Sequence, residues 1–266
     1  MARDHAHDLV QQDLPEVVRK IRARTPARLL EGRAGVAYRT ETQMELREAH
    51  AAARDAVRAE LNLESDFGAQ FVGKWGLFVA HTRAQTKDEF LLRPDLGRRF
   101  EPSAAAEIRK RCPPDTDIQI AIGDGLSVSA VARQVPPLLP LLVDGATGRG
   151  WKIGQPFAIR HCRVGILNEI GELLRPRVAV LLIGERPGLA TAESLSAYMA
   201  FRPRSQQTDA DRNLISNIHA RGVSPEAAAA RILNLAARMM QASLSGVQLR
   251  EDPVTGGVKF FDANLE

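Results

Sequence analysis

Four short runs of mostly apolar, branched residues in the second half of the chain constrain its fold more than any other feature. They are DIQIAI (117–122), PFAIRHC (156–162), RVAVLLI (177–183) and SAYMAF (196–201). Their apolar residues are mostly consecutive and do not alternate with polar ones, which is typical of strands covered on both faces. We therefore expect an open, mainly parallel sheet.

Helical segments separate several of these runs. LSVSAVARQV (126–135), GILNEIGELL (165–174) and DADRNLISNIH (209–219) have helical character, and a last helix is predicted over 225–242 with Ser224 as its N-cap. Strands that alternate with helices predict an α/β fold with right-handed crossovers and helices on both faces of the sheet.

The first third of the chain has helical periodicity instead. Asp13 and Glu16 have the spacing of a capping box, and apolar residues recur every three or four positions from Leu14. The same periodicity occurs in a second predicted helix, which begins at Thr40. His50 lies beside the apolar stripe of this second helix. We expect it to be a packed histidine and not a ligand.

A turn signature at RPDLG (93–97) marks a change in the character of the sequence. We therefore expect a helical N-terminal domain over 1–92 and an α/β domain over 93–266. The last residues, 248–266, are compatible with a hairpin around DPVTGG or with a mobile end, and the sequence leaves both possibilities open.

The composition excludes several classes of protein. No stretch approaches the ~20 consecutive apolar residues of a membrane span, and the N-terminus lacks the pattern of a secretory signal. The two cysteines, Cys112 and Cys162, have no CxxC spacing, so reduced thiols and a cytoplasmic protein are expected. His5 and His7 lie in a terminal tail, where we expect no metal site, and Cys162 is expected to be packed within a strand.

The formal net charge is +4 with a pI near 9.4, and much of the basic excess lies in the first 40 residues. A nucleic-acid-binding protein usually adds a recognisable module or aromatic residues to such a patch, whereas this region has only Tyr38. A solvated helix face or a docking surface for an acidic partner is the better interpretation.

Two predicted strands end in glycine-containing loops, IGDGLS (122–127) and IGERPGL (183–189). Ligands of open parallel sheets bind outside the carboxyl ends of strands, where glycine lets a ligand approach the backbone. Neither loop has the G-x-G-x-x-G pattern of a dinucleotide fold, the P-loop pattern or the Gly-x-Ser-x-Gly of a hydrolase. A tight turn without a ligand explains each loop equally well.

Two further groups of polar residues are candidates for a site. Glu185 beside Arg186 could hydrogen-bond a ligand amide or hydroxyl, or could form an ordinary exposed ion pair. In the predicted helix 209–219, Ser216 and His219 would share a face. His219 is either functional or a buried, satisfied histidine.

At these segments the sequence resembles the small (light) subunit of ethanolamine ammonia-lyase, an adenosylcobalamin-dependent lyase. The resemblance covers roughly residues 14 to 247 in the family's order and spacing, and the pairing of IGERPGL with ISNIH is highly specific. The matching segments are RPDLGRR (93–99), IGDGLS (122–127), IGERPGL (183–189), ESLSAY (193–198), ADRNLISNIHARG (210–222) and PEAAAARI (225–232).

The resemblance implies a small helical domain followed by a Rossmann-like domain. The family converts ethanolamine to acetaldehyde and ammonia by a radical route, whose chemistry the cofactor supplies. The substrate and the catalytic side chains belong to the large subunit, a TIM barrel. We therefore expect a hetero-oligomer, inactivity without the large subunit, no catalytic residue in this chain, and no nucleic-acid or membrane partner.

The family's cobalamin contacts map onto Val164, Glu185 and Leu214. At Leu214 this chain departs from relatives that carry cysteine, so a contact there would use the backbone or apolar packing. The string Asp-x-His-x-x-Gly is absent, so the resemblance implies that cobalt keeps the cofactor's own benzimidazole and that no residue here ligates metal. The short segment before Leu14 argues against residence in the ethanolamine microcompartment and leaves the bacterial cytoplasm as the expected location.

Two other classes of function remain open. The same sheet could serve a self-sufficient nucleotide-dependent oxidoreductase, although the third glycine of the dinucleotide pattern is missing. The arginine-rich N-terminal helix could serve a nucleic-acid-binding or scaffold protein, which would lose DNA affinity steeply with added salt.

Overall fold

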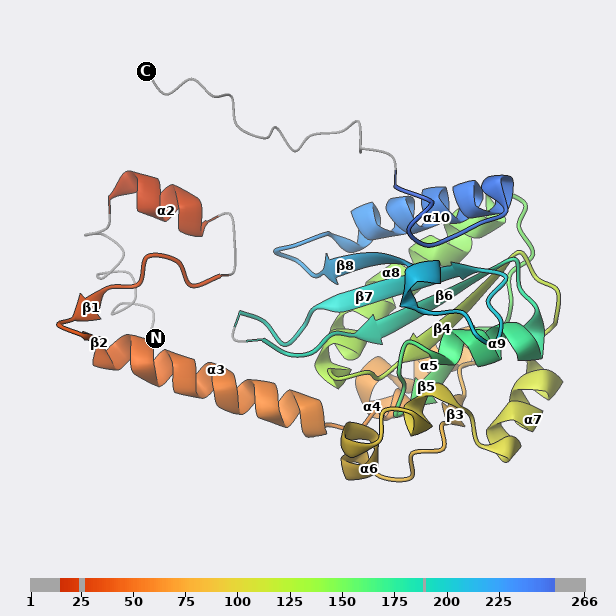
Figure 1. Ribbon diagram of the computed structural model, residues 1–266, viewed down its shortest axis with the longest axis horizontal. Coiled ribbons are helices and arrows are strands. Elements are labelled where there is room, and N and C mark those ends of the chain that lie inside the picture. Colours follow the sequence, from red (N-terminus) through yellow and green to blue (C-terminus); the bar gives the residue numbers. More distant parts are fainter. Residues whose placement is uncertain (1–14, 24–26, 189, 252–266) are drawn as a thin grey trace, which may run out of the picture.

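The apolar runs form a six-stranded sheet in the computed structural model, which describes residues 15–23, 27–188 and 190–251 (Figure 1). Parallel pairing joins the first four strands, and the last two are added antiparallel, so the fold is α/β with a mixed sheet. In order across the sheet, the strands are β3 (Val79–His81), β5 (Phe157–Arg160), β4 (Ile118–Gly123), β6 (Val178–Gly184), β7 (Leu195–Phe201) and β8 (Asn213–Ile218).

Helices cover both faces of the sheet, as predicted. α8 (Val128–Thr147) and α10 (Pro225–Ala242) share one core with it, and α7 (Pro102–Arg111) and α9 (Ile166–Leu174) share the other. Alternate side chains of β6 belong to the two cores, and all seven of its residues are buried. This explains why the predicted strands are apolar throughout.

The prediction of a helix over 209–219 is wrong. A 3-10 turn, η2 (Asp209–Asp211), leads into β8, which pairs antiparallel with β7. Ile215 and Ile218 are both buried although they are three positions apart, because the register shifts between their partners on β7 and Asn217 adopts a φ of +61°. This β-bulge places two residues at helical spacing on one face of a strand.

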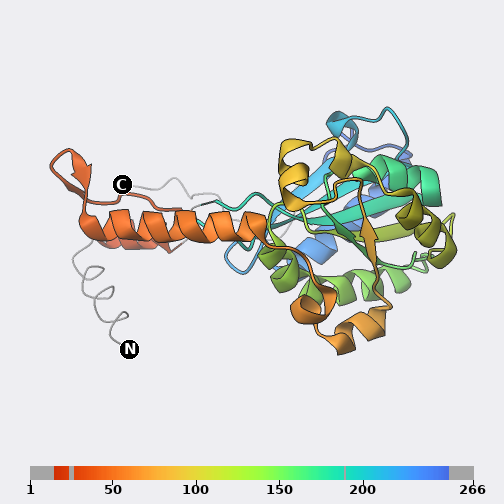
Figure 2. The ribbon, with the colours of Figure 1, turned by 90° about the horizontal axis from the view of Figure 1, so that it is seen from below.

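We call the six-stranded sheet and the helices that cover it the body. The residues that precede β3 divide into an extension and a part that packs on this body. We call residues 15–58 the arm, and Figures 1 and 2 show its described parts, 15–23 and 27–58, projecting from the body. The arm holds α2 (Glu16–Arg22), the hairpin β1 (Arg33–Ala34) and β2 (Ala37–Tyr38), and α3 (Thr40–Arg58). His50 on α3 is exposed, so the expectation that its side chain is packed is wrong.

Residues after the arm contribute to the body. Two short helices, α4 (Leu63–Phe67) and α5 (Ala69–Trp75), pack on the core shared by α8 and α10, and β3 pairs with β5. α6 (Lys87–Leu92) and the turn η1 (Leu96–Arg98) follow. The expected domain boundary at residue 92 therefore falls downstream of an edge strand of the main sheet.

The expectations for Asp13, His5 and His7, and for most of the 248–266 tail, concern positions outside the described residues. Among the described helices, none combines the length and apolar character needed to span a bilayer.

Candidate functional site

The carboxyl ends of β4, β5 and β6 meet at one end of the sheet, where the chain leaves neighbouring strands in different directions. β4 leads to α8 on one face, and β5 leads to α9 on the other. Loops that diverge in this way leave a crevice outside the strand ends, which is where open α/β sheets bind ligands.

A hollow of about 370 Å³, which we call the strand-end pocket, lies in this crevice. The loops after all three strands and parts of β7 and β8 line it. Val164 comes from the loop after β5, Glu185 from the loop after β6, and Leu214 from β8. The structure thus brings together the three residues that the family resemblance singled out.

Glu185 is held by hydrogen bonds and not by an ion pair. Its Oε1 accepts from Ser196 Oγ at 2.7 Å and from Asn217 N at 2.9 Å. No ion pair joins it to Arg186. Both of these hydrogen bonds are made by Oε1. Oε2 has no hydrogen-bond partner among the described residues, so it can accept a hydrogen bond from a ligand.

The pocket wall combines apolar and neutral polar groups. Val164 is partly buried against the core, whereas Leu214 is 45% exposed. Burial, together with the negative charges of Asp209 and Glu185, raises the pKa of Tyr198. This side chain is therefore a neutral hydroxyl at physiological pH.

Arg163 brings a positive charge to the same wall. Its Nη2 donates to the carbonyl oxygen of Phe90 at 3.0 Å, and its guanidinium lies over the Phe90 ring, 4.1 Å from the centroid. Burial, followed by the charges of Arg186 and Arg98, lowers the pKa of Arg163. The stacked arrangement holds this guanidinium beside the pocket and limits its freedom to move.

Three of the four loop glycines, Gly123, Gly125 and Gly184, serve close packing between protein segments, which is one of the two interpretations that the sequence left open. A Cβ at Gly184 would overlap the carbonyl oxygen of Ser127, and one at Gly123 would lie 2.6 Å from Cys162 Sγ. Gly125, at a φ of +57°, packs against the backbone of Gly184. These glycines let the loops approach each other and thereby shape the pocket.

A buried charged network behind the pocket was missed by sequence reasoning. Asp124 is fully buried, and its carboxylate accepts the backbone N–H groups of His161 and Cys162, both at 2.8 Å. Lys87 Nζ, from α6, lies 3.8 Å from Asp124 Oδ2 and 3.5 Å from the Gly125 oxygen. The acidic residue within IGDGLS was the available signal, but its partner lies 37 positions upstream.

The Asp124 network fixes the loop after β4 to the loop after β5. Burial lowers the pKa of Lys87, and the charge of Asp124 opposes that shift. His161, held at a φ of +58°, also directs Nδ1 to the Ala84 oxygen at 2.8 Å. Cys162 is buried as expected, but it follows β5 and does not lie within the strand. Burial, followed by the charge of Asp124, raises the pKa of its thiol well above the ordinary value, so the thiol stays protonated.

His219 is a satisfied histidine and does not pair with Ser216. Its Nε2 lies 2.7 Å from Asn217 Oδ1, and its Nδ1 accepts from the backbone N–H of Arg221 at 3.2 Å. Burial, followed by the charge of Arg221, lowers the pKa of His219. The neutral ring therefore closes the turn after β8, whereas Ser216 lies in the strand-end pocket.

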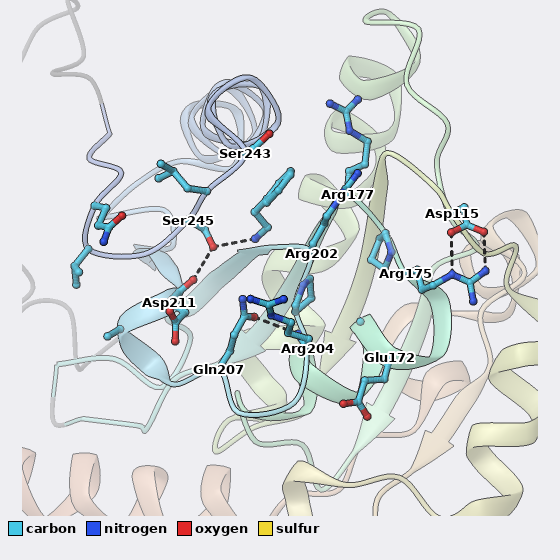
Figure 3. A pocket seen from close by; sticks show the side chains of 18 residues that line it. Asp115, Glu172, Arg175, Arg177, Arg202, Arg204, Gln207, Asp211, Ser243 and Ser245 are labelled. Atoms are coloured by element: carbon cyan, nitrogen blue, oxygen red, sulfur yellow. Dashed lines mark hydrogen bonds and ion pairs between the residues drawn. The ribbon is translucent and has the colours of Figure 1, made fainter.

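A larger hollow of about 980 Å³ lies at the opposite end of the sheet (Figure 3). It borders the start of β6, and none of the three expected cofactor contacts lines it. Two of its arginines are engaged, since Arg175 forms a bidentate pair with Asp115 at 3.0 and 2.7 Å and Arg177 contacts Asp117 at 3.0 Å. Within the described residues, no cluster of His, Cys, Asp and Glu could hold a metal.

The sequence of this chain matches that of a known protein family. The family model of the ethanolamine ammonia-lyase light chain matches residues 15–250. The chain belongs to this family. It is similar to ethanolamine ammonia-lyase small subunits throughout most of its length.

The small subunit of Clostridium perfringens is 40% identical over 235 residues, which cover 88% of this chain and 78% of the relative. That of Fusobacterium nucleatum is 36% identical over 254 residues, covering 91% and 84%. That of Clostridium acetobutylicum is 35% identical over 244 residues, covering 92% and 97%. A small subunit of a lyase complex implies a large partner subunit.

Proposed function

We propose that this ethanolamine ammonia-lyase small subunit helps bind adenosylcobalamin in the strand-end pocket, at an interface with the large catalytic subunit. The observation that supports this most is that Val164, Glu185 and Leu214, 50 positions apart from first to last, line one hollow at the strand ends. The complex would then deaminate ethanolamine to acetaldehyde and ammonia, and the cofactor would supply the radical chemistry.

The chemistry of the pocket suits a corrinoid. A corrin ring offers apolar faces and methyl groups, and amide side chains surround its edge. Val164 and the exposed side chain of Leu214 can pack against apolar surface. The unpartnered Oε2 of Glu185 can accept an amide N–H, and Ser216 and Tyr198 add hydroxyl groups.

The size of the pocket supports a shared site. Drug-sized ligands occupy about 300–1,000 Å³, and a corrinoid is larger than such ligands, so 370 Å³ accommodates only part of one. The remaining surface of the cofactor requires a second polypeptide. We infer that the chain alone has no lyase activity and that the substrate-binding and catalytic side chains belong to the large subunit, a TIM barrel.

The self-sufficient oxidoreductase is the weaker alternative because the start of α8 is covered. A dinucleotide fold places pyrophosphate at this helix N-terminus. Here Ser127 Oγ caps Ala130 N at 3.2 Å and donates to the Ala192 oxygen at 2.5 Å, and Leu126 N donates to the Gly184 oxygen at 3.1 Å. The loop after β6 thus occupies the place of the phosphate.

Several finer expectations stay predictions. They are the Rossmann-like description of the fold, the division into domains at residue 92, residence in the bacterial cytoplasm, and the absence of nucleic-acid and membrane partners. Retention of the cofactor's own benzimidazole on cobalt belongs with them.

Reconstitution tests the proposal. The purified chain should show no deaminase activity alone, and adding the cognate large subunit with adenosylcobalamin should produce it. Leu214→Arg should raise the cofactor concentration needed for half-maximal activity by about tenfold or more, because a loss of 1.4 kcal/mol corresponds to a factor of ten. Val247→Arg, at an exposed aliphatic residue beside the other hollow, is the matched control. Activity of the isolated chain, or equal behaviour of the two variants, would refute the proposal.

A further inference from the structure

Exposed apolar side chains are concentrated in the arm. Of the ten large hydrophobic residues that are exposed within the described ranges, seven lie in this segment. Scattered exposed apolar residues are ordinary, but such a concentration marks an interaction surface. The seven are Val17, Ile21, Leu29, Leu30, Val36, Tyr38 and Met44.

The arm has no core of its own. Its described part contains only two buried residues, Thr42 and Ala56, and the first large buried side chain among the described residues is Leu61. α2 has seven residues, none of them buried, and isolated helices of this length are unstable in water. Burial of apolar surface by a partner would supply the missing stabilisation.

Polar contacts give the arm its shape. Arg22 donates to the carbonyl oxygens of Leu29 and Leu30 at 2.9 and 3.0 Å. The guanidinium of Arg33 lies 5.7 Å from the centre of the Tyr38 ring across the β1–β2 hairpin. The turn of this hairpin places Val36 at its tip, where the side chain is 98% exposed. The arm therefore presents a defined apolar tip to the surroundings.

The arm projects from the same end of the sheet as the strand-end pocket. Figures 1 and 2 both show α3 and the loop between β6 and β7, which contributes Glu185 to the pocket, extending from the body in one direction. A polypeptide that covers the open pocket is therefore also placed to reach the arm.

The charge of the arm favours a different chain as its partner. Residues 15–58 contain ten Lys and Arg against six Asp and Glu, an excess of +4 that equals the net charge of the whole chain. In a symmetric contact between two copies, the same patch faces itself and these like charges would be juxtaposed. A different chain can instead offer an apolar groove bordered by carboxylates.

We propose that the arm is a docking segment for the large subunit, which binds its apolar tip in an acid-rimmed groove. This inference rests on the proposed function, because that function supplies the partner. It adds a second contact area, separate from the cofactor, so that the arm contributes to assembly even without adenosylcobalamin.

The test measures binding of the full chain to the recombinant cognate large subunit in the absence of cofactor. Val36→Glu should weaken this binding by about tenfold or more, whereas Val247→Glu, a 75% exposed valine at the other end of the sheet, should leave it within about twofold. Both variants should unfold at the wild-type temperature because both side chains are exposed. Arg33→Glu should also weaken binding, and its effect should shrink as salt is added.

Each other outcome decides the matter. The docking proposal is overturned if Val36→Glu binds the large subunit as tightly as the wild type. It is also overturned if Val36→Glu disrupts self-association of this chain and leaves its binding to the large subunit unchanged. Failure of the wild-type chain to bind the large subunit overturns both proposals. A wild-type complex that assembles through the arm but does not bind adenosylcobalamin overturns the proposed function alone.

Discussion

The shape of the strand-end pocket depends on a close approach between the loops after β4 and β6, and Gly184→Ala tests that approach. An added Cβ would overlap the Ser127 carbonyl oxygen and lie 2.9 Å from that of Asp124. Both obstacles are backbone atoms, so a side-chain rotation cannot relieve the overlap. The two loops would have to separate.

The expected cost lies at the upper end of the range for overpacking, about 3 kcal/mol. In a domain of this size about 1 kcal/mol shifts the melting temperature by roughly 2–4 °C, so a fall of about 6–12 °C is expected. Urea denaturation gives the free energy of unfolding, and thermal unfolding gives the midpoint. Because the loops line the pocket, the cofactor affinity of the reconstituted complex should also fall.

Gly188→Ala is the matched control in the same loop. The nearest atom to its added Cβ is Ala190 N at 4.0 Å, and its φ lies outside the left-handed region. Alanine there should be neutral or stabilise the chain by up to about 1 kcal/mol through the unfolded state. Equal stability of the two variants, within about 0.5 kcal/mol, would refute the close approach of the loops.

Two further predictions concern buried groups. Asp124→Ala should lower the free energy of unfolding by about 3–5 kcal/mol, because it removes the ion-pair partner of the buried Lys87. Adding Lys87→Met should recover part of this loss in urea denaturation, and strictly additive losses would contradict the pairing. Since the folded-state pKa of His219 is lowered, its neutral form stabilises the fold above the ordinary pKa of about 6.5, and this contribution is lost as the pH falls through the folded pKa. The stability gap between the wild type and His219→Gln should therefore narrow below about pH 6.5, and a gap independent of pH would exclude this role.

The central strands could be predicted because burial on both faces leaves a continuous apolar signature. β4 and β6 have no exposed residue, and their sequences contain almost no polar side chain. The direction of β7 could not be predicted in the same way, since a buried strand has the same composition in either orientation. β3 escaped detection because three residues are too few to show a pattern.

β8 shows how a local irregularity misleads a periodicity argument. An i, i+3 spacing of Ile215 and Ile218 is typical of a helix, but the bulge at Asn217 produces the same spacing in a strand. The buried Asp124–Lys87 pair escaped for another reason. Its two members are joined only by the tertiary fold, and a single sequence carries no signal that connects them.

The arm exposes a different limit of sequence reasoning. The apolar stripe of α3 predicts a helix that packs against something, but periodicity does not say whether the other surface belongs to the same chain. The arm, whose β1–β2 turn holds Val36, extends in the same direction as the loop between β6 and β7, which lines the strand-end pocket together with Leu214 (Figures 1 and 2). Both side chains are exposed and lie outside the chain's own cores. A chain that folds alone would gain stability by burying such residues, so the two proposals assign their exposure to apolar contacts with the large subunit and the cofactor.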